Sequence, residues 1–202
     1  MGTATWIAGS DQETGQIVLK AQSGRSRVDF ASASQSFSEI RVFDSLEPRY
    51  QTLAGGKWVT HAIHNSWVDP NWFFPALSTL VAGSQNGVTL ASTPDSSHLY
   101  ARFQIPNQKP AITSEVQNLS TVLYDLDAST RLPTGLHFYT HPDEDLGTNI
   151  PVDVLFSDYR AVNGVQVPFH MQRYVNGTLQ LEINLSTATL NAGVSDNDFV
   201  AN

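Results

Sequence analysis

Apolar and polar residues alternate along much of this chain, most regularly between Tyr159 and Ile183. This segment reads YRAVNGVQVPFHMQRYVNGTLQLEI, with Asn-Gly pairs at positions 163–164 and 176–177. Successive side chains of a β-strand point to opposite faces, and Asn-Gly favours the positive φ angles of a tight hairpin turn. The pattern predicts antiparallel strands, joined by two short hairpins, with one apolar face and one polar face.

The predicted apolar face extends over three long strands. Its members alternate with polar residues in each strand, and the polar set of the middle strand includes Gln166, His170 and Gln172. A sheet with one apolar face needs another element to cover that face and remove it from water. The residues expected on it are Val152, Val154, Phe156, Val165, Val167, Phe169, Met171, Leu179, Leu181 and Ile183.

Shorter strand-like segments fill most of the remaining sequence. Ser23-Gly24 and Gly55-Gly56 separate two pairs of them and indicate further hairpins. The second pair ends in KWVTHAIH, which places His61 and His64 within a predicted strand. Closely spaced strands with turn residues between them are typical of an antiparallel meander, not of βαβ units. We therefore predict a mainly β (α+β) fold built on a curved antiparallel sheet.

One segment, residues 70–82, has the features of a short helix. Asp69 can cap its first turn, Pro70 suits the first helical position, and Gly83 can end it. Pro75 would interrupt a helix that starts at Pro70, so we expect either a short turn before Pro75 or a later start. Apolar residues recur in this segment at spacings of three and four. We expect this helix to cover the concave apolar face of the sheet.

The length, net charge and cysteine content of the chain limit the class of protein. A chain of 202 residues fits a single domain, residues 1–202. The net charge of −8 argues against a nucleic acid partner and against docking on an anionic bilayer, because both need clustered Lys and Arg. The absence of cysteine excludes disulfides, thiolate nucleophiles and cysteine-ligated zinc. No apolar run is long enough for a transmembrane helix.

The beginning of the chain, MGTATWIAGSD, has neither the charged region nor the apolar region of a secretory signal peptide. The residues from Thr3 to Ala8 already have the pattern of a strand. We therefore expect that a native N-terminal segment has been trimmed, together with any signal peptide.

Two short segments combine histidine with possible metal ligands. His61 and His64 would share one face of a helix and could bind zinc with a third ligand, but in a strand they point to opposite faces. His141, Asp143 and Asp145 lie in one loop, whose carboxylates could hold a divalent cation or form a solvated turn. We predict no metal site, and these five residues are the candidates if one exists.

No motif of nucleophilic, zinc-dependent or nucleotide-dependent catalysis is present. The sequence contains no GxSxG, HExxH, GxGxxG or P-loop pattern. Asp125 and Asp127 form a carboxylate pair beside a turn, but a glycosidase would also need a deep cleft. We predict no catalytic residue and no cofactor, and we do not expect an enzyme.

The C-terminal half resembles the LolA/LolB-like family, which comprises bacterial lipoprotein carriers and uncharacterised periplasmic relatives. The resemblance covers about residues 115–200 and includes the hairpin LYDLDASTRLPTGLHF. The segments HNSWVDPNWFFPAL and HPDEDLGTNIPVDVLFSDY are also similar to acidobacterial proteins of unknown role that have this fold. The positions that match the family pattern are Asp127, Leu132, Pro133, Tyr159, Asn163-Gly164, Pro168, Asn176-Gly177, Asn191 and Phe199.

This resemblance implies a half-open antiparallel barrel, with helices along its concave side and an apolar cavity for acyl chains. It also implies a periplasmic or secreted protein. The arginine found in the cavity of the carriers would correspond here to Arg25 or Arg27.

The sequence and the resemblance lead to one main functional prediction, non-catalytic binding of a lipid or another hydrophobic molecule. One alternative is a structural or protein-interaction module with a filled cavity, whose partner would be an envelope protein. Another is a metal-dependent hydrolase that uses His61, His64 and His141. The dense aromatic residues between Trp58 and Phe74 could fill the core or line a pocket. The residues predicted to line the apolar pocket are Trp58, Trp67, Trp72, Phe73, Phe74, Leu77, Phe156, Phe169 and Met171.

Overall fold

The computed structural model describes residues 1–43, 48–68, 71–75, 88–92, 98–103 and 110–201. Within these ranges, thirteen strands form one antiparallel sheet in the spatial order β6-β5-β4-β3-β2-β1-β13-β12-β11-β10-β9-β8-β7. Consecutive strands are neighbours throughout each half of this order. The two halves meet where the first strand pairs with the last, with Gly2 opposite Leu185.

The first half of the sheet contains β1 (Gly2–Ala8), β2 (Asp11–Gln22), β3 (Arg25–Ala31), β4 (Ser36–Val42), β5 (Arg49–Ala54) and β6 (Lys57–Thr60). The second half contains β7 (Val88–Ser92), β8 (His98–Phe103), β9 (Val122–Leu126), β10 (Pro133–Thr140), β11 (Ile150–Val162), β12 (Val165–Val175) and β13 (Thr178–Leu185). The helical elements assigned in the described ranges are η1 (Ile63–Ser66), α1 (Pro110–Ser120) and η4 (Asp196–Phe199).

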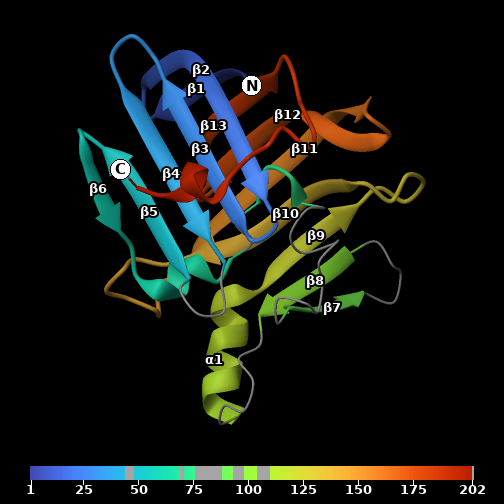
Figure 1. Cartoon of the computed structure of the whole chain (residues 1–202). Helices are drawn as coiled ribbons and strands as arrows, with labels where there is room; N and C mark the ends of the chain where they lie inside the picture. Colours follow the sequence, from blue (N-terminus) through green and yellow to red (C-terminus); the bar gives the residue numbers. More distant parts are fainter. Residues whose placement is uncertain (44–47, 69–70, 76–87, 93–97, 104–109, 202) are drawn as a thin grey trace.

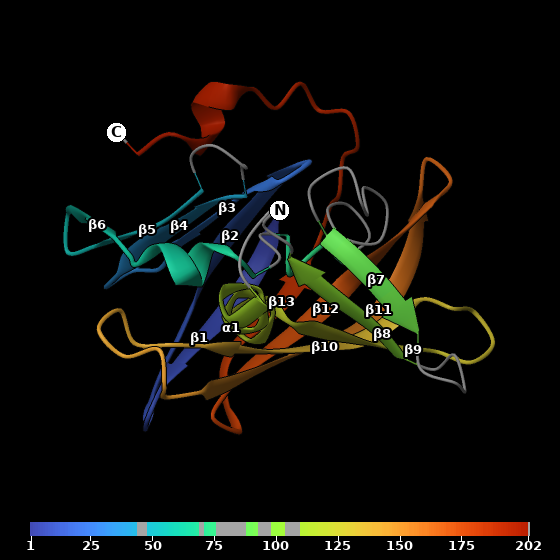
Figure 2. The same ribbon diagram turned by 90° about the horizontal axis from the view of Figure 1, so that it is seen from below.

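The sheet is strongly curved, as a half-barrel (Figure 1). Helix α1 projects below the strands, at one end of the half-barrel, in Figure 1, and Figure 2 looks along its axis. The C-terminal segment with η4 lies on the convex side of the first strands. The predicted mainly β, half-barrel architecture is thus confirmed.

The two Asn-Gly pairs form the predicted hairpin turns. Asn163 and Gly164, between β11 and β12, have φ angles of 49° and 84°. Asn176 and Gly177, between β12 and β13, have φ angles of 50° and 73°. Two consecutive positive φ angles match the twist of the paired strands, so these turns fix the register of the three-strand ribbon.

The main core lies on the concave face of the sheet. It includes most of the predicted apolar face, but Val165, near the tip of the ribbon, is 41% exposed. Phe138 and Tyr124 from β10 and β9 extend the core toward α1, which contributes buried Val116 and Leu119. Predicted residues that are buried in this core are Val152, Val154, Phe156, Met171, Leu181 and Ile183.

The strand predicted through His61 and His64 is wrong. Strand β6 ends at Thr60, and η1 follows it. Local hydrogen bonds hold η1: the Ser66 hydroxyl donates to the Ile63 carbonyl at 2.6 Å, and the Asn65 N–H donates to the Ala62 carbonyl at 3.0 Å. Because β6 is the edge strand of the sheet that the structure describes, its backbone pairs with a described strand, β5, on one side only, and local bonds prevail.

Helix α1 was not predicted from the sequence. Pro110 at its first position and the i, i+4, i+7 spacing of Ile112, Val116 and Leu119 are the sequence signals for it. Val116 and Leu119 are buried against the core, whereas Ile112 is 45% exposed. None of the helices in the described ranges has the length and hydropathy needed to cross a membrane.

The helix predicted over residues 70–82 falls largely outside the described residues. Asn71 to Phe73 form a turn, Phe74 lies in a bend and Pro75 is helical, which agrees with the predicted turn before Pro75. Residues 69–70 and 76–87 are outside the described ranges, so the rest of this helix stays a prediction.

The C-terminal segment closes a second, smaller core on the convex face. Phe199 of η4 packs on Ile40 and Val42 of β4. Arg25 pairs with Asp196, and Lys20 pairs with Asp198 at 2.6 Å. The polar contacts to this segment come from residues that alternate with core residues on β2 and β3, as the period of a strand requires.

Candidate functional site

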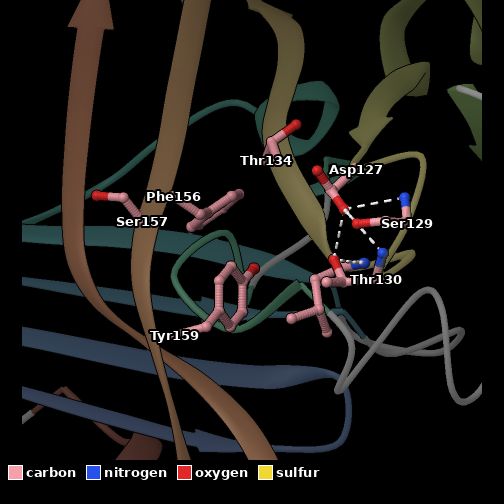
Figure 3. A pocket seen from close by; sticks show the side chains of 8 residues that line it. Asp127, Ser129, Thr130, Thr134, Phe156, Ser157 and Tyr159 are labelled. Carbon is pink, nitrogen blue, oxygen red and sulfur yellow. Dashed lines mark hydrogen bonds between the residues drawn. The ribbon is translucent and has the colours of Figure 1, made fainter.

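A pocket of about 350 Å³ lies between the β9–β10 turn and strand β11 (Figure 3). Its volume falls in the range of about 300–1,000 Å³ that is usual for small-molecule sites. One side is formed by the turn, and the other by the part of β11 that extends beyond its last pair with β10, Gly135 opposite Leu155. The lining residues are Asp127, Ser129, Thr130, Leu132, Thr134, Phe156, Ser157 and Tyr159.

The turn that forms the rim is held by one carboxylate. Asp127 Oδ1 accepts hydrogen bonds from the backbone N–H groups of Ser129 (3.0 Å) and Thr130 (2.7 Å). It also accepts bonds from the hydroxyls of the same two residues, at 2.7 and 2.9 Å. These bonds, the Thr130 backbone bond first, hold the pKa of Asp127 well below its usual value. The rim is therefore a preformed turn of the Asx type.

The rings of Phe156 and Tyr159 form the floor of the pocket (Figure 3). Phe156 is buried in the main core, and Tyr159 packs against that core. The Tyr159 hydroxyl donates to the Pro133 carbonyl at 2.6 Å, which ties β11 to the start of β10. Burial raises the pKa of Tyr159, so the phenol stays neutral. The floor is thus aromatic and uncharged.

The predicted pocket residues lie in several different environments. Phe156 lines the pocket. Trp72, Phe73 and Met171 are buried in the main core, and Phe74 packs against it. These four residues belong to the concave side, but they fill the interior of the half-barrel and do not line this pocket.

The remaining predicted pocket residues lie elsewhere. Trp58 packs on the convex side, against the cluster of Ile40, Val42 and Phe199. Trp67 is half-buried at the C-terminal end of η1. Phe169 is buried, with the guanidinium carbon of Arg160 4.4 Å above its ring centre. Leu77 is outside the described residues.

A buried charged cluster lies on the concave face beside the aromatic core. Glu39 accepts bonds from Arg41 Nε (3.1 Å), Trp72 Nε1 (3.3 Å) and the Tyr50 hydroxyl (3.3 Å). Arg173 of β12 reaches the same carboxylate, with Nη1 3.7 Å from Glu39 Oε2. We call these five residues the Glu39 cluster. It joins β4 and β5 of one half of the sheet to β12 of the other.

Opposite charges keep the Glu39 cluster ionised despite its burial. Burial raises the pKa of Glu39, but Arg41, Arg173 and the bond from Trp72 outweigh it, and the pKa is lowered. Burial lowers the pKa of Arg41, but Glu39 outweighs it, and the pKa is raised. Burial and the Glu39 charge raise the pKa of Tyr50, which keeps its proton.

The arginines that the resemblance implies for the cavity do not face it. Arg25 pairs with Asp196, and Arg27 pairs with Asp29 at 2.8 Å and donates to the Asp198 carbonyl at 3.2 Å. Both lie on the convex face, under the C-terminal segment. Among the arginines whose side chains the structure describes, Arg41 and Arg173 lie on the concave side, and no pattern in the sequence indicated them.

The residues predicted as candidate metal ligands form hydrogen bonds to protein groups. The carboxylate of Asp143 binds His61 Nδ1 at 3.0 Å and accepts the Ala62 N–H at 2.9 Å, which ties the loop to η1. His61 Nε2 contacts the Thr52 hydroxyl at 2.9 Å. The two carboxylate oxygens of Asp145 accept bonds from Gly147 and Thr148 within its own loop.

The other two histidines of this group also have protein partners. His64 Nε2 contacts the Pro142 carbonyl at 3.3 Å, and His141 Nε2 contacts Asn149 Oδ1 at 2.9 Å. In the part of the chain that the structure describes, no group of three or more His, Asp or Glu side chains has a geometry that could hold a metal ion. These contacts do not support the metal-dependent hydrolase.

Two histidine networks were not anticipated from the sequence. His170 contacts the Ser157 hydroxyl through Nδ1 at 2.7 Å and Glu182 through Nε2 at 2.9 Å. His137 bridges Asp153 (2.7 Å) and Asp125 (2.8 Å) across three strands. The histidines of both networks alternate with buried residues along their strands, so the two networks lie on the polar face of the sheet. Figure 3 shows the Ser157 hydroxyl pointing away from Phe156.

The three comparisons with known proteins identify the fold but not a family. No family model matches the sequence. No curated protein matches it. A solved structure of a DUF1329 family protein from Desulfovibrio piger aligns with a TM-score of 0.54 and 10% identity, over 98% of this chain and 87% of that one.

A second solved structure belongs to a LolA superfamily protein from Nitrosomonas europaea. It aligns with a TM-score of 0.52 and 10% identity, over 99% of this chain and 87% of that one. At this identity, the likeness concerns the arrangement of strands and carries no shared residue role. The chain therefore has the fold that LolA superfamily and DUF1329 proteins share, the curved antiparallel half-barrel.

Proposed function

We propose that this protein binds a lipid or another hydrophobic molecule, without catalysis, in the pocket between the β9–β10 turn and β11. One observation carries the proposal: the pocket has a preformed rim, fixed by Asp127, and an uncharged aromatic floor of Phe156 and Tyr159. Apolar walls with a few fixed polar groups are typical of sites for hydrophobic ligands. The resemblance to lipoprotein carriers supports the same ligand class and a periplasmic or envelope location.

The second candidate is a structural or protein-interaction module, and the packing of the interior favours it. Trp72 and Phe73 are 3% and 6% exposed and occupy the concave side together with Met171. In the described residues, the middle of the half-barrel is thus filled by the protein's own side chains. The two candidates differ in one respect, since only the first requires that the pocket at Phe156 accept a ligand.

Ligand uptake distinguishes the two candidates. The purified protein is incubated with a fluorescent fatty acid, and native mass spectrometry records the bound stoichiometry. We expect one ligand for each chain. Thr134→Trp should reduce the uptake strongly, because Thr134 is an exposed wall residue and the larger side chain occupies the pocket. The matched control is Thr3→Trp on β1, an exposed threonine that does not line the pocket. Equal uptake by both variants, or no uptake by the native chain, would rule out this site.

A further inference from the structure

Arg173 has far fewer polar contacts than a guanidinium group can make. It carries five N–H donors, and its neighbours in the strand register are Val154 and Leu181, both buried apolar residues. Its side chain is 19% exposed, and its buried Nε atom has no hydrogen-bond partner among the residues that the structure describes. Among the described residues, its one ion pair is with Glu39, at 3.7 Å, which is too long for a hydrogen bond.

The Glu39 cluster holds one positive charge in excess. Arg41 and Arg173 contribute two positive charges and Glu39 one negative charge, while Tyr50 stays neutral. Glu39 already accepts bonds from Arg41, Tyr50 and Trp72. Buried charges are normally paired and hydrogen-bonded, because an uncompensated one is strongly destabilising. Within the described part of the protein, Arg173 therefore shares its anionic partner, Glu39, with Arg41 and has no carboxylate of its own.

We propose that Arg173 binds the carboxylate of a long-chain acid whose hydrocarbon chain occupies the pocket at Phe156. This inference rests on the proposed function and specifies its ligand class. The planar fork of a guanidinium group matches the two oxygens of a carboxylate. A carboxylate brings one negative charge, which matches the excess of the cluster. A phosphate monoester would bring about −1.5 to −2 charges close to Glu39 and would overcompensate it.

The two parts of this site are close along the ribbon. Phe156 is opposite Met171, and Val154 is opposite Arg173, so Phe156 and Arg173 belong to adjacent cross-strand pairs of the concave face. Two residues of a strand span about 7 Å, a distance that an extended acyl chain can cover. Met171 lies between them and is 1% exposed. Its unbranched thioether chain can adopt other rotamers and admit a ligand.

Headgroup selectivity tests this inference in the native protein. Dodecanoate, dodecyl phosphate and dodecanol are titrated against a neutral fluorescent probe, N-phenyl-1-naphthylamine, which each ligand displaces. We expect dodecanoate to bind at least about tenfold more tightly than dodecanol, as a charge-assisted pair would provide, and more tightly than the phosphate. Equal affinity for acid and alcohol would overturn the role of Arg173. Preference for the phosphate would overturn the assignment to a carboxylate.

Substitution of Arg173 tests whether this residue causes the preference for dodecanoate. Arg173→Met keeps the length of the side chain and removes its charge. It should abolish the preference for dodecanoate and leave the affinity for dodecanol unchanged. Arg25→Met, which removes an arginine from the convex face, is the matched control and should retain the preference. If Arg173→Met weakens the binding of dodecanoate and dodecanol equally, or changes the binding of neither, Arg173 does not recognise the carboxylate, although the pocket still binds lipids. If no ligand displaces the probe from the native protein, the proposed function fails as well.

Arg173→Met could also impair folding, because Arg173 contacts Glu39 and lies 5.5 Å from the ring centre of Trp72. Arg173→Lys then provides the second variant. It retains the charge but loses the planar fork, so we expect an intermediate preference for dodecanoate over dodecanol. An undiminished preference in Arg173→Lys would contradict recognition by the guanidinium fork.

Discussion

Phe156 and Tyr159 both pack against the main core from strand β11, although residues at positions i and i+3 of a regular strand point to opposite faces. The reason lies between them. Asp158 has a φ angle of 52°, and its pair with Phe169 is the one missing from the otherwise continuous register of β11 and β12. This single left-handed residue lets two aromatic rings form the floor of the pocket.

Substitutions of Asp158 test the importance of this backbone conformation. Asp158→Gly should leave the stability and the ligand uptake nearly unchanged, because glycine adopts positive φ without steric cost. Asp158→Val should lower the Tm by about 2–8 °C, since a β-branched residue is strained in this region, and should also weaken ligand uptake. Thermal unfolding and probe displacement measure the two effects. A fully stable, fully binding Asp158→Val variant would show that the left-handed residue does not shape the floor.

The stabilisation that Asp127 gives to the rim of the pocket should depend on pH. The pKa of Asp127 is lowered in the folded protein by bonds from Thr130 and Ser129. A group with a lowered folded pKa stabilises the fold above its unfolded pKa, and this contribution is lost as the pH falls toward the folded pKa. Asp127→Asn should therefore reduce the Tm at neutral pH, and the difference from the native protein should shrink in acid. Asp11→Asn, an exposed aspartate on β2, is the control. A difference that grows in acid would contradict this role.

The opposite pH dependence is expected for His137. Burial lowers its pKa, but its bonds to Asp153 and Asp125 outweigh this, and the pKa is raised above 6.5. The stabilisation is therefore present below the unfolded pKa and is lost as the pH rises through the folded pKa. His137→Gln should reduce the free energy of unfolding more at about pH 5.5 than at about pH 8.5. Urea denaturation at both pH values measures this. Asp153→Asn should weaken the same dependence, whereas a pH-independent loss in His137→Gln would mean that His137 only packs.

The C-terminal segment should affect stability without affecting the pocket. Phe199 is 1% exposed and fills the cluster with Ile40 and Val42 on the convex face. Phe199→Ala should reduce the free energy of unfolding by about 3–5 kcal/mol, the usual result of removing a buried aromatic ring. Val200→Ala is the neighbouring control, since Val200 is 40% exposed. At a temperature where the variant is folded, its ligand uptake should equal that of the native protein. A selective loss of uptake would place the binding site partly on the convex side.

The strand pattern of this protein could be predicted from the sequence because its causes are local. Alternating side chains and the Asn163-Gly164 and Asn176-Gly177 turns determine the ribbon without reference to other elements. The edge position of β6 is not local, and the strand predicted through His64 was wrong for that reason. Helix α1 had a readable signal in Pro110 and the spacing of Val116 and Leu119.

Most of the candidate site could not be predicted, because it depends on contacts between distant segments. The Glu39 cluster joins β4 to β12, which are more than a hundred residues apart in sequence. The positive φ of Asp158, which moves Tyr159 toward the core, has no signature in a segment that otherwise alternates regularly. The sequence therefore indicated an apolar face correctly, but among the described residues only Phe156 of the predicted pocket set lines the pocket.

Methyl NMR during a titration with dodecanoate tests whether a hydrophobic ligand enters the pocket at Phe156. We predict saturable shifts of the Leu132 and Thr134 methyl signals, with no change for Ile40 and Val42 on the convex face. Thr134→Trp should abolish the Leu132 shift. Unshifted Leu132 and Thr134 signals at saturating dodecanoate, or shifts spread equally over both faces, would show that the ligand does not bind in this pocket.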